Sequence, residues 1–199
     1  MNDKHSSNTQ TLAYTNRKGA TYYLHEGRTK SGKPRYFFAR SIGEGSLGEL
    51  PTGYEVTETM NGVVSVRRHR EDEFAIPDHD LALVRGELER HAHLRHYAAI
   101  ADRGAIVIHQ PDVSLADLRN TARHCLTRGQ AETFVADAIR RAHFSPVLRL
   151  VYDDSTYVVQ RMTYRGAGGW SYPLSSGPLD ELVREFVHKL GTDDFFDLM

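Results

Sequence analysis

Positively charged side chains are concentrated in one short stretch of the sequence. Four lysine and arginine residues fall within eight positions: Arg28, Lys30, Lys33 and Arg35. Five aromatic residues flank them: Tyr22, Tyr23, Tyr36, Phe37 and Phe38. Basic side chains bind phosphate and carboxylate groups, and aromatic rings interleaved with them can stack on bases. The four basic residues are therefore predicted to contact an anionic partner, either nucleic acid or an acidic protein.

The same residues also have a purely structural explanation. Lysines and a proline (Pro34) on an exposed hairpin prevent its edge from pairing with other chains, and the aromatic residues would then form the inner face of a sheet. On sequence alone this protective role is slightly favoured, and both interpretations stay open.

A glycine-rich string at residues 43–48 (GEGSLG) matches the pattern G-x-G-x-x-G. A dinucleotide site needs a helix directly after this string, so that backbone N–H groups face the phosphates. The following residues, 49–53 (ELPTG), do not begin a helix, and the other signatures of a protein kinase are missing from the sequence. The string is predicted to be a connecting loop.

Three of the 11 histidines lie close together in the sequence: His91, His93 and His96. On a helix, residues two apart point in nearly opposite directions, so His91 and His93 could not share a metal ion. His93 and His96 could, but no third ligand accompanies them. We therefore expect a solvated helix surface, no metal and no cofactor. An enzyme that uses these histidines in a site between two halves of the chain is the alternative, and whether the protein is an enzyme stays open.

Cys125 is the single cysteine, and Trp170 is the single tryptophan. Cys125 falls on an apolar helical stripe, so it is predicted to be a small buried side chain and not a nucleophile. Trp170 follows a glycine-rich loop and is predicted to anchor that loop, with a stacking role as the alternative. A chain with one cysteine forms no internal disulfide, which favours a reducing compartment such as the cytoplasm.

The elements that must position these residues follow from hydrophobic periodicity and turn residues. Four strands are predicted to form an antiparallel meander over 14–69: 20–26, 35–40, 54–59 and 63–67. Asn61-Gly62 predicts a type I′ turn between the last two. Three helices and three strands should follow: a helix at 80–101, a strand at 105–109, helices at 115–129 and 130–143, and strands at 147–152 and 156–164. Pro178 and Gly191 delimit a last helix.

This order of strands, helices, strands and a helix predicts the α+β class. We expect a flexible tail at 1–12, an antiparallel β unit at 13–70 and an α+β unit at 78–199, the last two possibly forming one continuous domain. No apolar run reaches the length of a membrane span, and no secretory signal is present, so a cytoplasmic protein without a membrane partner is expected.

Charge is distributed unevenly along the 199 residues. Residues 1–40 hold eight basic and two acidic residues, a net charge of +6, whereas the whole chain carries −1. The remaining residues therefore carry −7. This asymmetry predicts a non-enzymatic binding module that meets an anionic partner through the basic hairpin. Alternatively, the acidic residues of 179–199 meet the hairpin within the same molecule or form an interaction surface themselves. The oligomeric state is not predicted.

Overall fold

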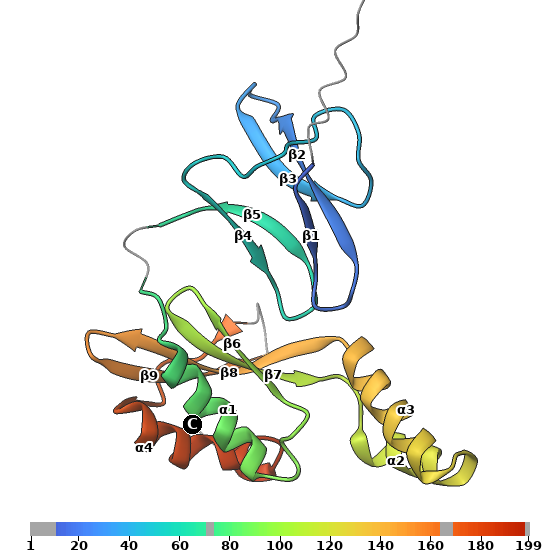
Figure 1. Cartoon of the computed structure of the whole chain (residues 1–199). Coiled ribbons are helices and arrows are strands. Elements are labelled where there is room, and N and C mark those ends of the chain that lie inside the picture. Colours follow the sequence, from blue (N-terminus) through green and yellow to red (C-terminus); the bar gives the residue numbers. More distant parts are fainter. Residues whose placement is uncertain (1–10, 71–73, 164–168, 198–199) are drawn as a thin grey trace, which may run out of the picture. The chain divides into compact units, whose positions relative to one another are not determined.

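Short runs rich in β-branched and aromatic residues form the first five strands of the chain. The computed structural model describes residues 11–70, 74–163 and 169–197. The chain divides into two units, residues 1–71 and 72–199, and each is described by itself. In the first unit, β1 (Ala13–Thr15), β2 (Thr21–Arg28) and β3 (Pro34–Ala39) form an antiparallel sheet in that order (Figure 1). The strands β4 (Tyr54–Glu58) and β5 (Val64–Arg68) form a separate two-stranded ladder.

The four predicted strands are thus present as β2 to β5, but they do not form one continuous meander. The rings of Tyr36 on β3 and Tyr54 on β4 meet edge to face with their centroids 4.9 Å apart. Most of the predicted tail, residues 1–10, lies outside the described residues. Leu12, which the tail was expected to include, hydrogen-bonds to Leu24 and Leu47.

The turn between β4 and β5 is not of type I′. Only Gly62 has a positive φ, and the N–H groups of Gly62 and Thr59 bond to the carbonyls of Thr59 and Val63. This is a type I turn followed by a bulge, the usual three-residue hairpin loop. Positive φ at both central residues, as in type I′, occurs instead at Arg103-Gly104 and Asp154-Ser155.

An antiparallel sheet forms the centre of the second unit, with β10-β9-β8-β7-β6 as its strand order and β11 also pairing with β9. The bounds are β6 Ala98–Asp102, β7 Ala105–Pro111, β8 Phe144–Asp153, β9 Thr156–Thr163, β10 Gly169–Trp170 and β11 Ser175–Gly177. The helices α1 (Asp78–Arg90) and α4 (Leu179–Phe186) lie against this sheet (Figure 1). The 3-10 helix η1 (Val187–Lys189) and α5 (Asp193–Phe196) follow α4.

The predicted helix at 80–101 is wrong in its second half. The helix α1 ends at Arg90, and residues 98–102 form β6. The sequence Ala-Ala-Ile-Ala of β6 has high helix propensity, but pairing with β7 over five positions overrides it. The histidines at 91–96 therefore lie in the connection after the helix.

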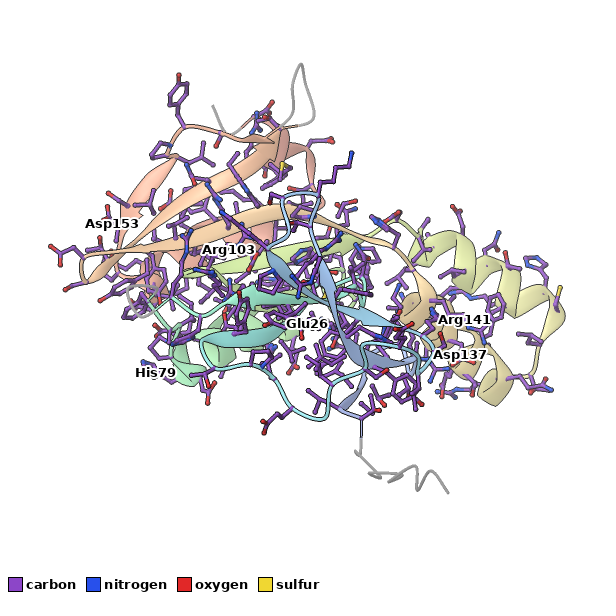
Figure 2. The ribbon with its side chains drawn as sticks, turned by 90° about the horizontal axis from the view of Figure 1, so that it is seen from above. Glu26, His79, Arg103, Asp137, Arg141 and Asp153 are labelled. Atoms are coloured by element: carbon purple, nitrogen blue, oxygen red, sulfur yellow. The ribbon has the colours of Figure 1, made fainter. Side chains whose placement is uncertain are left out.

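The helices α2 (Leu115–Cys125) and α3 (Arg128–Arg141) form a hairpin that extends from the ends of β7 and β8 (Figure 1). Ser114 caps α2 by accepting a bond from the Asp117 N–H, as expected from the sequence. The predicted stop at Gly129 is wrong, because α2 ends at Cys125 and Gly129 lies inside α3. Cys125 is exposed, which also contradicts the predicted buried position. Charged side chains such as Asp137 and Arg141 surround α3 (Figure 2).

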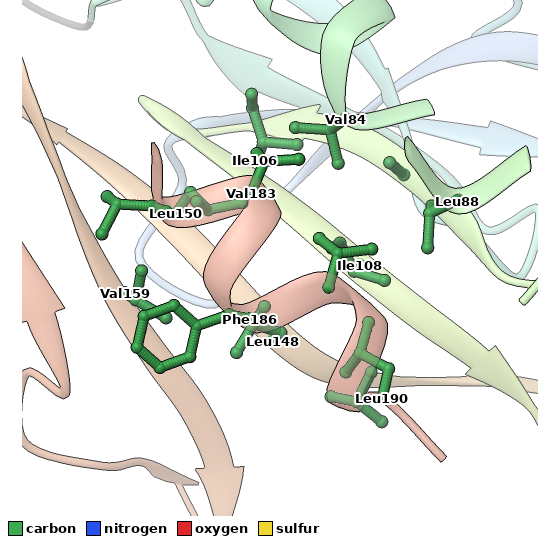
Figure 3. Packing of buried hydrophobic residues seen from close by; sticks show 14 of the residues in the cluster. Val84, Leu88, Ile106, Ile108, Leu148, Leu150, Val159, Val183, Phe186 and Leu190 are labelled. Carbon is green, nitrogen blue, oxygen red and sulfur yellow. The ribbon is translucent and has the colours of Figure 1, made fainter. Parts of the chain in front are cut away.

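One hydrophobic core holds the second unit together, between one face of the sheet and the helices α1 and α4 (Figure 3). Its fully buried members alternate along the strands, as expected for a sheet with one covered face: Ile106, Ile108, Leu148, Leu150 and Val159. The stripe Leu179, Leu182, Val183 and Phe186 of α4 packs against them. The fold belongs to the α+β class, as the sequence predicts. None of the helices in the described residues is long and apolar enough to cross a bilayer.

Candidate functional site

The turn between β2 and β3 carries the predicted basic residues and is closed by its own hydrogen bonds. The Thr29 N–H donates to the Lys33 carbonyl (2.9 Å), and the Gly32 N–H donates to the Thr29 carbonyl (2.9 Å). The Lys33 N–H also donates to the Thr29 hydroxyl at 3.1 Å. Gly32 has φ +78°, which glycine adopts without strain. The tip therefore has a defined backbone before any partner arrives.

Strand register fixes where the four cations point. Arg28 is opposite Pro34, and Arg35 is opposite Gly27. Because successive side chains on a strand alternate, Arg28 and Arg35 lie on opposite faces of the hairpin, and Lys30 and Lys33 lie in the turn between them. All four side chains are exposed. We call the four together the basic hairpin.

Two carboxylates of the same unit, Glu55 and Glu58, are bound to other cations. Glu58 accepts bonds from the Arg17 backbone N–H (2.8 Å), from Arg17 Nε (2.9 Å) and from the Tyr14 hydroxyl (2.9 Å). Glu55 pairs with His69 and Arg67. The hydrogen bonds from these two side chains lower the pKa of the Glu55 carboxyl group, and the bond from His69 has the larger effect. Among the described residues, no carboxylate lies within ion-pair distance of any basic-hairpin side chain. The described residues therefore leave the positive charge of the basic hairpin without a counter-ion.

The aromatic rings near the basic hairpin are already in contact with other groups. Phe37 stacks on His25 with centroids 5.5 Å apart, and the Arg35 guanidinium lies 5.9 Å from the Phe37 centroid. His25 is itself buried and bonded to the Ser41 carbonyl. Phe38 meets Tyr14 at 6.0 Å. These rings stabilise the sheet, so the arrangement favours contacts to charge over stacking on bases.

A further cation, Arg40, counts toward the charge of residues 1–40 but was not predicted as part of the basic site. It is exposed at the far end of β3, with its guanidinium 5.2 Å from the Tyr22 centroid and its Nη2 donating to the Tyr22 hydroxyl. Alternation places Arg40 on the same sheet face as Arg28, which follows from the register of β2 and β3. The alternation of side chains along β3 could have placed Arg40 on this face from the sequence alone if the register of β2 and β3 had been known.

The glycine string at 43–48 forms a connecting loop and is not followed by a helix, as predicted. The structure also ties this loop to β2. The Glu26 N–H donates to the Gly45 carbonyl (2.7 Å), and Ser46 forms a bridge with His25. A Cβ atom on Gly45 would lie 2.6 Å from the Glu26 carbonyl oxygen, and the φ of Gly45 is +82°. This glycine is needed for the close approach of two backbones.

The histidine stretch differs from the prediction in geometry. Because α1 has ended, the rings of His91 and His93 lie 5.9 Å apart, and His188 lies 6.4 Å from His91. His91 Nε2 is 3.1 Å from Glu87 Oε1. In the part of the chain that the structure describes, no three histidine, cysteine or acidic side chains are placed to hold a metal ion.

Comparison with known proteins assigns this chain to no group. No protein family matches its sequence. No curated protein and no solved structure is similar to it. Its class is defined by the α+β fold and the basic hairpin alone.

Proposed function

We propose that the protein is a non-enzymatic binding module that contacts an anionic partner, nucleic acid or an acidic protein, through Arg28, Lys30, Lys33 and Arg35. One observation carries this proposal: four exposed cations surround a turn with a fixed backbone, and no described carboxylate neutralises them. Arg40, at the other end of β3, adds one exposed cation on the sheet face that carries Arg28.

The occupied rings refine the kind of contact. Since Phe37 and Phe38 already pack against His25 and Tyr14, the binding energy comes mainly from charge and not from base stacking. The partner is then recognised by the density of its negative charge. The single cysteine favours a reducing compartment, so a cytoplasmic location is part of the proposal.

The test is fluorescence anisotropy with three labelled probes: a short DNA duplex, a single-stranded RNA and a polyglutamate peptide. Each is titrated with the full chain from about 50 to 200 mM salt. At least one probe should bind, with an affinity that falls steeply as salt rises. The probe that binds most tightly identifies the class of partner.

Charge-reversal variants locate the contact. Lys30→Glu with Lys33→Glu should weaken binding and, on duplex DNA, reduce the slope of log affinity against log salt by about two. The matched control, Arg103→Glu with Arg128→Glu, changes the net charge equally at exposed arginines elsewhere. The proposal is wrong if no probe binds at low salt, or if the lysine variant binds as the unaltered protein does.

A further inference from the structure

Arg149, which is far from the basic hairpin in the sequence, lies on strand β8 in the sheet of the second unit. In the register of β7, β8 and β9, Val107 is opposite Arg149, and Arg149 is opposite Gln160. The neighbouring row, Ile106, Leu150 and Val159, belongs to the core beneath α1 and α4. Because side chains alternate along a strand, Arg149 and Gln160 stand on the other face of the sheet.

Two side chains hold the Arg149 guanidinium in one orientation. Its Nε donates to Gln160 Oε1 at 2.8 Å, and Gln160 Nε2 in turn donates to the Ser171 carbonyl at 2.9 Å. This second bond fixes which end of the amide faces the arginine. The guanidinium carbon lies over the Trp170 ring, 4.5 Å from the ring centroid. The arginine is thus ordered by its neighbours before any ligand is present.

The charge of Arg149 has no counter-ion among the described residues. No carboxylate lies within ion-pair distance, and the only bond from the guanidinium to a described side chain or carbonyl is the one from Nε. Arg149 is half-buried, and this burial lowers the pKa of its guanidinium. Arginine nevertheless stays protonated in proteins. A partly desolvated cation with two unused NH₂ groups is stabilised by an anion that reaches it.

The surroundings indicate the rest of the ligand. Val151, Val158 and Met162 lie on the same face of the sheet and are half-buried. A guanidinium binds a carboxylate or phosphate through two parallel hydrogen bonds in its own plane, and the two NH₂ groups of Arg149 donate to no described residue. We infer that Arg149, oriented by Gln160 and Trp170, binds the carboxylate or phosphate of a small organic anion whose apolar part contacts this sheet face.

Trp170 makes the inference directly testable, because it is the only tryptophan in the chain and its fluorescence reports on this site alone. The full chain is titrated with cyclohexanecarboxylate, cyclohexyl phosphate and the neutral cyclohexanecarboxamide at constant ionic strength. Trp170 emission should change saturably with at least one of the two anions and not with the amide. The anion that binds with the lower Kd shows whether the site prefers a carboxylate or a phosphate headgroup.

Arginine variants separate ligand binding from a role in holding β10 in place. Arg149→Gln should raise the apparent Kd by about tenfold or more, and Arg149→Lys, which keeps the charge without the planar fork, should also weaken binding. Arg128→Gln, which removes a fully solvated arginine from α3, should leave the titration unchanged. If Arg149→Gln fails to fold by circular dichroism, the comparison of anion with amide on the unaltered protein decides. Equal responses to anion and amide, no response at all, or an unchanged Kd in a folded Arg149→Gln would overturn the inference.

Discussion

Glu58 connects three groups of the first unit. Its side chain is only 9% exposed and accepts bonds from Tyr14 and from both the backbone and the side chain of Arg17. Glu58→Ala should lower the free energy of unfolding by about 1–3 kcal/mol, because it leaves these donors without an acceptor. Urea denaturation measures this loss. Glu44→Ala, at an exposed position, is the control, and equal losses in the two variants would contradict the assigned role of Glu58.

His96 should make stability depend on pH. Burial, and secondarily the charge of Arg119, lower the pKa of its imidazole below the usual 6.5, and its Nδ1 has no hydrogen-bond partner among the described residues. The unfolded chain therefore binds a proton on His96 more readily than the folded chain, so this group destabilises the fold as the pH falls through about 6.5. Urea titrations at pH 7.5 and pH 5.5 should show a smaller drop in stability for His96→Gln than for the unaltered protein. A larger drop in stability for His96→Gln than for the unaltered protein would contradict the lowered pKa of His96.

At the scale of elements, the loop at 43–48 should depend on Gly45 and not on Gly43. Gly45→Ala should destabilise the protein by about 1–3 kcal/mol, because the added Cβ meets the Glu26 carbonyl and the backbone has a positive φ. Gly43→Ala is a matched control, since its Cβ would meet only the His25 ring at 3.9 Å. Thermal unfolding of the two variants is the measurement. Similar effects of the two changes would show that the close approach to β2 is not what requires glycine.

The α2–α3 hairpin should be the least protected helical part of the second unit. No residue of α3 is buried, and Ala122 is the only buried residue of α2, whereas β7 is buried over most of its length. Local opening is easiest where little apolar surface is covered. Native-state hydrogen exchange should give amides of α3 at least about tenfold lower protection than those of β7 and β8. Equal protection would mean that the hairpin opens only with the whole unit.

The elements show which sequence signals decide structure and which do not. Pro178 and Gly191 bound the predicted helical segment, because they act through the backbone itself, but the segment is α4 up to Phe186 and then the 3-10 helix η1. The strands β2 to β5 follow from alternation and β-branched residues. The strand β6 could not be predicted, since its alanines favour a helix and only pairing with β7 makes it a strand. The apolar stripe of α2 predicted a buried Cys125, but nothing covers that end of the helix enough to bury it.

At the scale of the whole molecule, charge is separated along the chain although the net charge is −1. The full chain should therefore bind to heparin resin at pH 8 despite its negative net charge, and Lys30→Glu with Lys33→Glu should elute at clearly lower salt. Arg103→Glu with Arg128→Glu has the same net charge and should elute near the unaltered protein. If both variants shift equally, retention depends on total charge and not on the basic hairpin.

The candidate site was only partly predictable from the sequence. The four basic residues fall within eight positions of the sequence, so their clustering could be predicted without tertiary information. The binding of Glu58 by Arg17 could not be foreseen, since the two residues are 41 positions apart in the sequence. The contact of Arg149 with Trp170 depends equally on strand pairing, through β9, between distant segments.

The closed turn at residues 29–33 has a consequence for selectivity. Because hydrogen bonds hold Thr29, Gly32 and Lys33 in place, the distances between the attached ammonium and guanidinium groups vary only through their side-chain rotamers. A partner whose negative groups repeat at the same interval could form ion pairs with all of these cationic groups at once. An equally charged partner with irregular intervals would gain from fewer, so under the proposed function we expect the hairpin to discriminate by spacing.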